Sequence, residues 1–358
     1  MNSLINFLMI IFFKKRDIAS HIHRKFFAEW IKPIYPTVRH SLYGLHEQDL
    51  LLSKSEEDAD VLILPLTWNY YLEYGKLSDA MNTIQEYEKY KKPILSWTSG
   101  DYSLKIPEGN YVLLQHNLSK SKLKKNQYAY PAIIRDPIAN LKLYGIDVLS
   151  PLNNFSISFC GVANRHFIDK YKNQLKEFFF KIKSKMKKPY LSLDAPISGM
   201  KLRGDILHSF VRNTELKTNI IIRNPKDGFK IENQIYKTEY WDNMLSAPFT
   251  LCIRGNGNFS VRLYEALALG RIPVIIDTDC VFPLENQIDW QRHCIFIFDK
   301  DPKNSVRIAR QLLGRMSNDH IRKLQLINRK LWLESLSFAG FYYNFSEYVL
   351  NNLIPEFS

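Results

Sequence analysis

The chain has 358 residues, of which 46% are hydrophobic and 13% aromatic, so it can bury two ordinary cores and does not resemble a disordered protein. Its four cysteines, Cys160, Cys252, Cys280 and Cys294, have no short paired spacing, so neither a zinc cluster nor a disulfide framework is indicated and reduced cytoplasmic thiols are expected. The net charge of +13 indicates an acidic partner, and nucleic acid, anionic lipid and phosphorylated small molecules all remain open.

The first half of the chain alternates between predicted strands and helices. Residues 4–13 form an apolar run that is too short to cross a bilayer, which needs ~20 residues, and neither a preceding basic region nor a cleavage site marks a signal peptide. We favour a buried strand there over a shallow membrane foot. Residues 61–66, 94–97 and 111–115 are further predicted strands, and residues 77–90 have a helical pattern. This alternation is typical of a parallel sheet with both faces covered.

Turn-forming residues without periodicity mark a domain boundary at 145–154. We therefore predict one Rossmann-like domain over residues 1–150 and a second over residues 151–325. A helical tail is predicted to follow over residues 326–358.

A second series of strands and helices follows the boundary. Its lysine-rich segment 167–186 has apolar residues at helical spacing, which favours a solvated surface helix over a membrane-surface contact. Further helices are predicted at 204–211 and 261–269, and the pattern is mainly helical from residue 305. The predicted strands are 156–160, 190–193, 219–223, 249–253, 272–276 and 294–298. The fold class expected is α/β, with two Rossmann-like domains.

A glycine loop between a predicted strand and helix carries the clearest chemistry. Arg254 is followed by Gly255, Asn256, Gly257 and Asn258, then by Ser260 in position to cap the helix, and Gly270 is placed to end it. Glycines allow backbone amides to approach a phosphate, and the free amides of a helix N-terminus favour an anion. The alternative is a tight strand-to-helix turn without a ligand.

Charged side chains extend this anion site toward a nucleotide. Arg254 and Arg262 bring guanidinium groups to the same helix end. Glu265 follows Arg262 by three residues, so both project from one side of the helix. A carboxylate there can accept protons from the two hydroxyls of a ribose. Phosphate and ribose together indicate a nucleotide.

The segment from Arg254 to Val274 resembles the exostosin family of glycosyltransferases, in which RG-x-G-x-x-S-x-R-x-x-EAL-x-x-G-R-I-PV is close to a fingerprint. The resemblance implies a GT-B fold, in which two Rossmann-like domains face each other and the second holds the donor. It implies that Arg254, Ser260 and Arg262 bind the diphosphate and that Glu265 binds the ribose. Many GT-B enzymes have two glutamates eight apart, but here Gly257 occupies the first position.

Other arginines and acidic groups are weaker candidates. Arg203 and Arg223, and also Arg165, lie near the ends of predicted elements and could reach the diphosphate, with a surface salt bridge as the alternative. The pairs Asp58 with Asp60 and Asp277 with Asp279 spell Asp-x-Asp, a metal motif of another transferase fold. We favour loop hydrogen bonds for these aspartates and expect no metal cofactor.

Transfer to a hydroxyl acceptor requires a base across the cleft. Asp101, in a glycine-bounded turn after a predicted strand, is the first choice, with Asp136 and His116 as alternatives. A structural role is the alternative for each.

These observations predict a glycosyltransferase of the exostosin-like hexosyltransferase or glycuronosyltransferase type. Its expected donor is a nucleotide sugar, specifically a UDP-sugar used with inversion, and its acceptor is a glycan or lipid-linked glycan in polysaccharide synthesis. We expect it in the cytoplasm, with contact to an anionic membrane, and without nucleic acid as a partner, because no nucleic-acid motif accompanies the lysines. The alternative is a non-catalytic glycan- or nucleotide-binding partner of a transferase pair.

Overall fold

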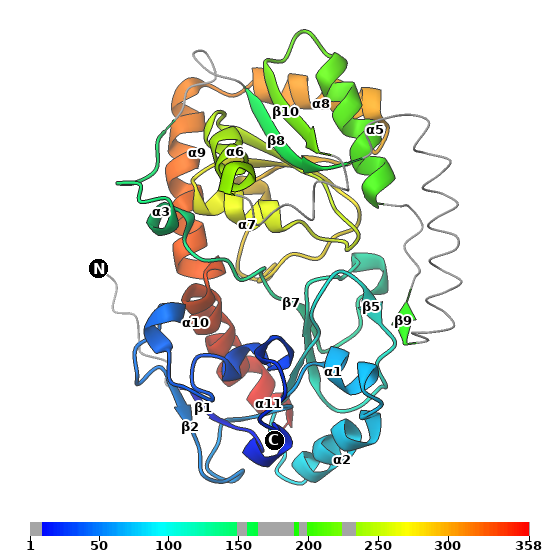
Figure 1. The fold of residues 1–358 in the computed structure, drawn as a ribbon, viewed down its shortest axis with the longest axis vertical. Coiled ribbons are helices and arrows are strands. Elements are labelled where there is room, and N and C mark those ends of the chain that lie inside the picture. Colours follow the sequence, from blue (N-terminus) through cyan, green and yellow to red (C-terminus); the bar gives the residue numbers. More distant parts are fainter. Residues whose placement is uncertain (1–8, 149–155, 164–189, 193–198, 224–233, 358) are drawn as a thin grey trace.

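The computed structural model describes residues 9–148, 156–163, 190–192, 199–223 and 234–357. Figure 1 shows two parallel-sheet domains, one above the other, with helices of the C-terminal region running along one side of both. This is the GT-B arrangement of two Rossmann-like domains that the sequence predicts. The lysine-rich segment 167–186 and Arg165 lie outside the described residues.

The first domain is built on a six-stranded parallel sheet of order β2-β1-β3-β4-β6-β7. Every residue of β3, β4 and β6 is buried, as the apolar runs predict for strands covered on both faces. The predicted strand in the run 4–13 is confirmed as β1. The strands are β1 (Met9–Phe12), β2 (Leu50–Leu52), β3 (Val61–Ile63), β4 (Ile94–Trp97), β6 (Val112–Gln115) and β7 (Gln127–Ala129), and the helices are α1 (Trp68–Glu73), α2 (Leu77–Glu88) and α3 (Pro137–Asn140).

The second domain has a five-stranded parallel sheet of order β10-β8-β11-β12-β13. Helices α5 and α8 pack together, and α7 packs against the later helix α9. The strands are β8 (Ile157–Val162), β10 (Thr218–Arg223), β11 (Phe249–Cys252), β12 (Ile272–Ile276) and β13 (Ile295–Ile297), and the helices are α5 (Gly199–Arg212), α6 (Gln234–Leu245), α7 (Val261–Ala268) and α8 (Pro302–Gly314).

One predicted strand of the second series joins neither parallel sheet. Residues 190–193 include β9 (Leu191–Ser192), which pairs antiparallel with β5 (Ser103–Leu104) of the first domain. The short ladder therefore links the two halves of the chain next to the turn that holds Asp101.

The predicted stop of the helix after the glycine loop is confirmed at Gly270. Its φ of +67° lies in the left-handed region, where glycine is favoured. Its amide donates to the carbonyl of Leu267, and the amide of Arg271 donates to that of Ala266, which completes a Schellman motif. The chain then turns directly into β12.

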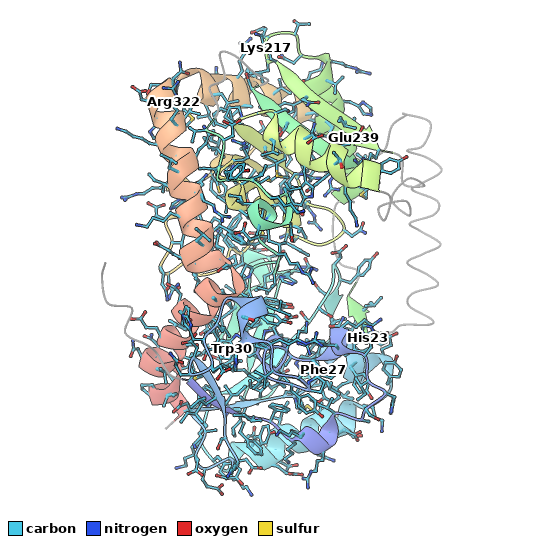
Figure 2. All side chains as sticks on the ribbon, turned by 60° about the vertical axis from the view of Figure 1, so that its left-hand side comes forward. His23, Phe27, Trp30, Lys217, Glu239 and Arg322 are labelled. Carbon is cyan, nitrogen blue, oxygen red and sulfur yellow. The ribbon has the colours of Figure 1, made fainter. Side chains whose placement is uncertain are left out.

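The C-terminal helices connect the second domain back to the first. Helix α9 (Asn318–Leu331) packs on α7, and α10 (Phe338–Tyr348) carries aromatic side chains into the core of the first sheet. Trp30 contacts Tyr342 and Phe345 of α10, with ring centroids 5.1 and 6.1 Å apart. Figure 2 shows this run of helices along both domains, with Arg322 near its upper end and Trp30 near its lower end.

Short helical turns complete the described structure. Two π-helical turns, Trp332–Leu336 and Val349–Leu353, flank α10. The last described helix is α11 (Ile354–Phe357). The 3₁₀ turns are Lys15–Asp17, Arg24–Phe26, Glu29–Ile31, His40–Tyr43, Lys120–Lys122 and Trp290–Arg292. In the part of the chain that the structure describes, no helix is both long enough and apolar enough to span a bilayer.

Candidate functional site

The order of the second sheet reverses direction between β8 and β11. In open α/β sheets of this order, ligands bind at the carboxyl ends of the strands at such a switch point. The glycine loop follows β11 at this point, and α7 begins at Val261 directly after it. Three arginines from three elements meet there.

Arg203 of α5 joins the ends of the two central strands. Its Nη1 donates to the carbonyl of Val162, the last residue of β8, at 3.2 Å, and its Nη2 donates to that of Ile253, directly after β11, at 2.9 Å. Burial, together with the nearby charge of Arg262, lowers the pKa of Arg203 to about 9. The group thus stays cationic at neutral pH, although it is largely removed from water.

Arg262, at the start of α7, is only 8% exposed. Its Nη2 donates to the carbonyl of Cys160 at 2.7 Å, and its guanidinium lies 4.1 Å from the centroid of the Phe159 ring. Gly161 makes this approach possible, because a Cβ there would lie 2.6 Å from Nη2 of Arg262. The sequence reasoning missed Gly161, which has no motif of its own.

Arg254 is held by its own loop. Its Nη1 donates to Oδ1 of Asn258 and its Nη2 to the carbonyl of Asn256, both at 3.2 Å. Burial lowers the pKa of Arg254 below its ordinary value. Gly255 lies against Arg203, since a Cβ on it would be 3.2 Å from Nη2 of that arginine.

The three arginines form a concentrated positive site. None of Arg203, Arg254 and Arg262 forms a salt bridge with a described residue, and the Nε of each is buried without a hydrogen-bond partner in the described part of the chain. Nearby guanidinium groups without paired carboxylates repel one another, and a bound polyanion would relieve this repulsion.

Glu265 lies at this site in contact with Tyr240 of α6. The hydroxyl of Tyr240 donates to Oε2 of Glu265. Burial raises the pKa of Glu265, while the tyrosine hydrogen bond and Arg262 oppose that rise. The Tyr240 ring also lies 5.7 Å from the guanidinium of Arg262, so one aromatic side chain orients both predicted ligand-binding groups. Tyr240 was not among the site residues that the sequence predicted.

Other predicted donor residues have different positions. Ser260 occupies the N-cap of α7, but its side chain makes no capping hydrogen bond, so that prediction was wrong in its chemistry. Its hydroxyl is thus not used by the helix. Arg223 donates to Oε2 of Glu239 at 2.8 Å and to the carbonyl of Tyr236 at 2.7 Å, which matches the salt-bridge alternative.

Asn258 and Gly257 hold the two domains together. The amide of Asn258 donates to Oδ1 of Asn117 at 2.6 Å, and its Nδ2 donates to the carbonyl of Leu118 at 3.0 Å. A Cβ on Gly257 would lie 2.8 Å from the carbonyl oxygen of Asp101. The glycine loop therefore packs against the carboxyl ends of β4 and β6 in the first domain.

The structure separates the three candidate bases. Asp101 lies beside the glycine loop, where its carboxylate interacts with Asn256 and with the charge of Arg203; loss of hydration raises its pKa, against the effect of both. Asp101 belongs to the first domain, so this interaction brings its carboxylate next to an arginine of the second.

His116 and Asp136 have structural partners. His116 lies between the rings of Tyr130 and Phe259, with centroids 3.8 and 5.1 Å away, and burial lowers its pKa to about 4. Asp136 accepts from Nη1 and Nη2 of Arg329 at 2.9 and 2.6 Å and caps α3 through the amide of Ile138. Of the three, Asp101 is the one whose carboxylate interacts with an arginine of the cluster.

The Asp-x-Asp aspartates make loop hydrogen bonds, as expected. Asp279 accepts from the amide of Ser121 at 3.1 Å, and Asp277 accepts from the amide of Asp279 at 3.2 Å. Asp60 accepts from the amide of Ile10 at 2.7 Å and Asp58 from the hydroxyl of Ser55 at 2.8 Å. Within the described ranges, no three metal-binding side chains gather in one cluster.

Part of the chain is similar in sequence to known glycosyltransferases. Residues 145–312 match the sequence model of the Exostosin GT47 domain. A probable beta-1,4-xylosyltransferase IRX10 of Arabidopsis thaliana is 41% identical over 66 residues, which cover 18% of this chain and 16% of that protein. A probable glucuronosyltransferase, Os04g0398600 of Oryza sativa subsp. japonica, is 36% identical over 88 residues, covering 25% and 20%. The matches thus span a fifth or less of these relatives' length.

Two solved structures are similar over nearly the whole chain. Anabaena Alr3699/HepE in complex with UDP-glucose has 7% identity and a TM-score of 0.41, covering 95% of this chain and 98% of that one. The lipopolysaccharide outer core galactosyltransferase WaaB has 13% identity and a TM-score of 0.43, covering 94% and 99%.

Proposed function

We propose that the protein is a glycosyltransferase that moves a sugar from a nucleotide-sugar donor to a glycan, because residues 145–312 match the sequence model of the Exostosin GT47 domain. The observation that carries this proposal is the cluster of Arg203, Arg254 and Arg262 at the switch point, without a paired carboxylate among the described residues. A nucleoside diphosphate supplies the negative charge that this cluster lacks. The donor we propose is a UDP-sugar.

The arginines would act on the leaving group. As the bond between the anomeric carbon and the diphosphate oxygen breaks, its electron pair stays on that oxygen. Preorganised cations stabilise the developing charge, and their fixed hydrogen bonds mean that little reorganisation is needed during the reaction. Glu265, held by Tyr240, is placed to accept the ribose hydroxyl protons.

Asp101 is the proposed base. The acceptor oxygen attacks the anomeric carbon from the face opposite the diphosphate, which inverts that centre, and its proton passes to the Asp101 carboxylate. A raised pKa makes that carboxylate a better proton acceptor than an ordinary aspartate. Since arginines supply the positive charge at the diphosphate, we expect transfer without an added divalent metal.

The location and acceptor are also proposals. We propose that the protein works in the cytoplasm at an anionic membrane face, on a glycan or lipid-linked glycan of polysaccharide synthesis, because its net charge is +13. Sedimentation with phosphatidylglycerol vesicles tests this, since binding should fall as salt is raised. Sedimentation that is absent at low salt would contradict it.

Substitution of Arg254 and Glu265 tests the proposed function. Arg254→Ala should weaken UDP binding about tenfold or more, because hydrogen bonds to charged groups contribute ~1.5–3 kcal/mol. Glu265→Ala should weaken UDP but leave inorganic diphosphate binding less affected. Calorimetric titration measures both, and release of the corresponding nucleotide from a panel of UDP-, GDP-, CMP- and dTDP-sugars measures turnover.

Matched controls are available on the surface. Arg322→Ala and Glu347→Ala change exposed residues of the same types on α9 and α10. Both variants should bind UDP like the parent. Equal UDP affinity in Arg254→Ala and Arg322→Ala would contradict the donor site. UDP binding without turnover on any acceptor would instead indicate the non-catalytic partner of a transferase pair.

A further inference from the structure

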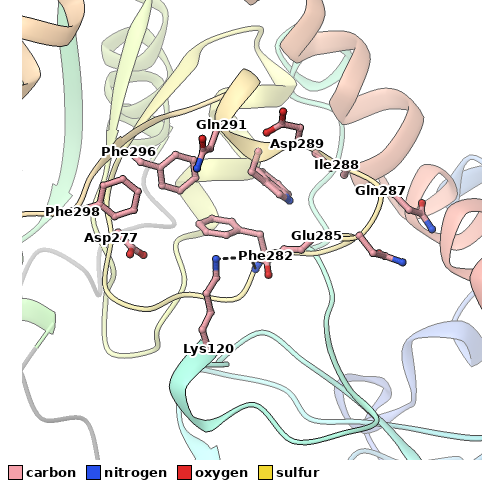
Figure 3. Close-up of a pocket in the computed structure, with 12 residues that line it drawn as sticks. Lys120, Asp277, Phe282, Glu285, Gln287, Ile288, Asp289, Gln291, Phe296 and Phe298 are labelled. Carbon is pink, nitrogen blue, oxygen red and sulfur yellow. Dashed lines mark hydrogen bonds and ion pairs between the residues drawn. The ribbon is translucent and has the colours of Figure 1, made fainter.

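A cavity lies one loop away from the cluster of Arg203, Arg254 and Arg262. A cavity of about 550 Å³ opens at the carboxyl ends of β12 and β13, between Asp277 and Phe298, which directly follow those strands (Figure 3). Lys120 of the first domain reaches over its edge. The volume falls within the ~300–1,000 Å³ of small-molecule sites. The function proposed above uses none of these residues.

Aromatic rings form one side of the cavity. Phe296 and Phe298 stack with centroids 6.0 Å apart and planes inclined by 14°, and Phe298 is 68% exposed. Phe282 and Trp290 pack 5.0 Å apart, and Nε1 of Trp290 donates to the carbonyl of Pro283 at 3.0 Å. The outer ring therefore offers an apolar face to solvent on a rigid support. Such a face, electron-rich at its centre, suits the C–H groups of a ligand.

Polar groups surround these rings. Gln287, Gln291 and Asp289 lie on the segment between Phe282 and β13, and Asp277 lies on the opposite side (Figure 3). Glu285 accepts from Nζ of Lys120 at 3.1 Å. Carboxylates and amides next to an apolar face suit a ligand that carries several hydroxyls on an apolar ring, as a sugar does.

The charge of this cavity differs from that of the rest of the molecule. Glu285 is paired with Lys120, and Asp289 with Arg292 at 2.9 Å, whereas no salt bridge to a described residue is formed by Asp277. Its carboxylate accepts the amide of Asp279 and otherwise faces the cavity. An uncompensated carboxylate repels an anionic ligand. The cavity thus favours neutral sugars, although the whole chain carries +13.

Hydrogen bonds through Asn258 connect this cavity to the arginine cluster. Thr278, next to Asp277, donates through Oγ1 to Oδ1 of Asn258 at 2.7 Å, and the same oxygen accepts from Arg254. A chain lying in the cavity is therefore one loop from the diphosphate site. We propose that the cavity between Asp277 and Phe298 is a subsite for a neutral sugar unit of the acceptor glycan. This inference rests on the proposed transferase function.

Saturation-transfer NMR on the full chain tests the subsite. The probes are neutral tetrasaccharides, namely cellotetraose, xylotetraose and maltotetraose, with tetragalacturonate as the anionic comparison. We expect transfer to at least one neutral probe and less to tetragalacturonate. Phe298→Ala and Asp277→Asn should each lower the affinity for the neutral probe about fivefold, because one aromatic or charged contact is lost.

Matched variants and a second ligand separate the outcomes. Tyr144→Ala removes a fully exposed aromatic residue elsewhere, and Asp58→Asn changes a distant loop aspartate; both should bind the probe like the parent. Absence of binding to all neutral probes, stronger binding of tetragalacturonate, or unchanged binding in Phe298→Ala would overturn the subsite. UDP binding, measured in parallel, should persist in Phe298→Ala. Loss of UDP binding in the parent would contradict the proposed function instead.

Discussion

The position of Arg262 depends on the lack of a side chain at Gly161. Gly161 allows the guanidinium to reach the carbonyl of Cys160 and stack on Phe159, and Tyr240 closes the other side. The aromatic rings shield the arginine from water, so that its charge acts over a larger distance than it would on the surface.

Gly161→Ala should therefore lower the affinity for the donor more than it lowers the stability of the fold. The new Cβ would displace Arg262, whose Nη2 lies 2.6 Å from that position. We expect UDP affinity to fall about tenfold, since a charged hydrogen bond is lost or misdirected. Gly314→Ala is the control, because a Cβ there meets nothing within 4 Å. If calorimetry gives both variants the affinity of the parent, Arg262 does not hold the diphosphate.

His116 makes stability depend on pH. Burial holds its pKa at about 4, below the ~6.5 of an exposed histidine, so the unfolded chain takes up its proton first as pH falls. The stabilisation is complete above pH ~6.5 and is lost between there and pH ~4. At pH 5 the loss should be up to about 2 kcal/mol.

The measurement is urea unfolding at pH 7 and pH 5. His116→Phe keeps a ring between Tyr130 and Phe259 but cannot bind a proton, so its stability should change less between the two pH values. Identical pH dependence in parent and variant would show that other groups are responsible.

At the scale of elements, α10 belongs to the core of the first domain although it is at the end of the chain. Phe345 packs on Trp30, on Tyr128 with centroids 5.5 Å apart, and on Phe341 at 5.3 Å. Phe345→Ala should cost about 3–5 kcal/mol, as in other cores, and lower the melting temperature. Leu326→Ala, an exposed change on α9, should not. UDP affinity below the melting transition should stay unchanged, and its loss would contradict this assignment.

Local patterns predicted most elements of the fold. The buried strands and the stop of α7 at Gly270 follow from apolar runs and glycine conformation, which act within a few residues. The pairing of β9 with β5 joins residues far apart in the sequence, and no local pattern indicates it. The same holds for the packing of α10.

The candidate site was predictable to the same extent. Arg254, Arg262 and Glu265 were indicated by one short segment and do lie together, with Arg203 beside them. Gly161 and Tyr240 were missed as site residues because they act through contacts from other elements. Asn258 was expected at the donor, yet its side-chain amide is used between domains, which only the three-dimensional contacts reveal.

At the scale of the whole molecule, two of the crossings between the domains lie side by side. One crossing lies between β7 and β8, where α3 packs against α7, and the other lies between α9 and α10 (Figure 1). The pair Asp136 and Arg329 joins the first crossing to the second at 2.6 Å. Further links lie beside the glycine loop, where β5 pairs with β9 and the amide of Asn258 donates to Asn117. Motion of one domain relative to the other has to break some of these contacts, so together they keep the proposed base, Asp101, close to the arginines.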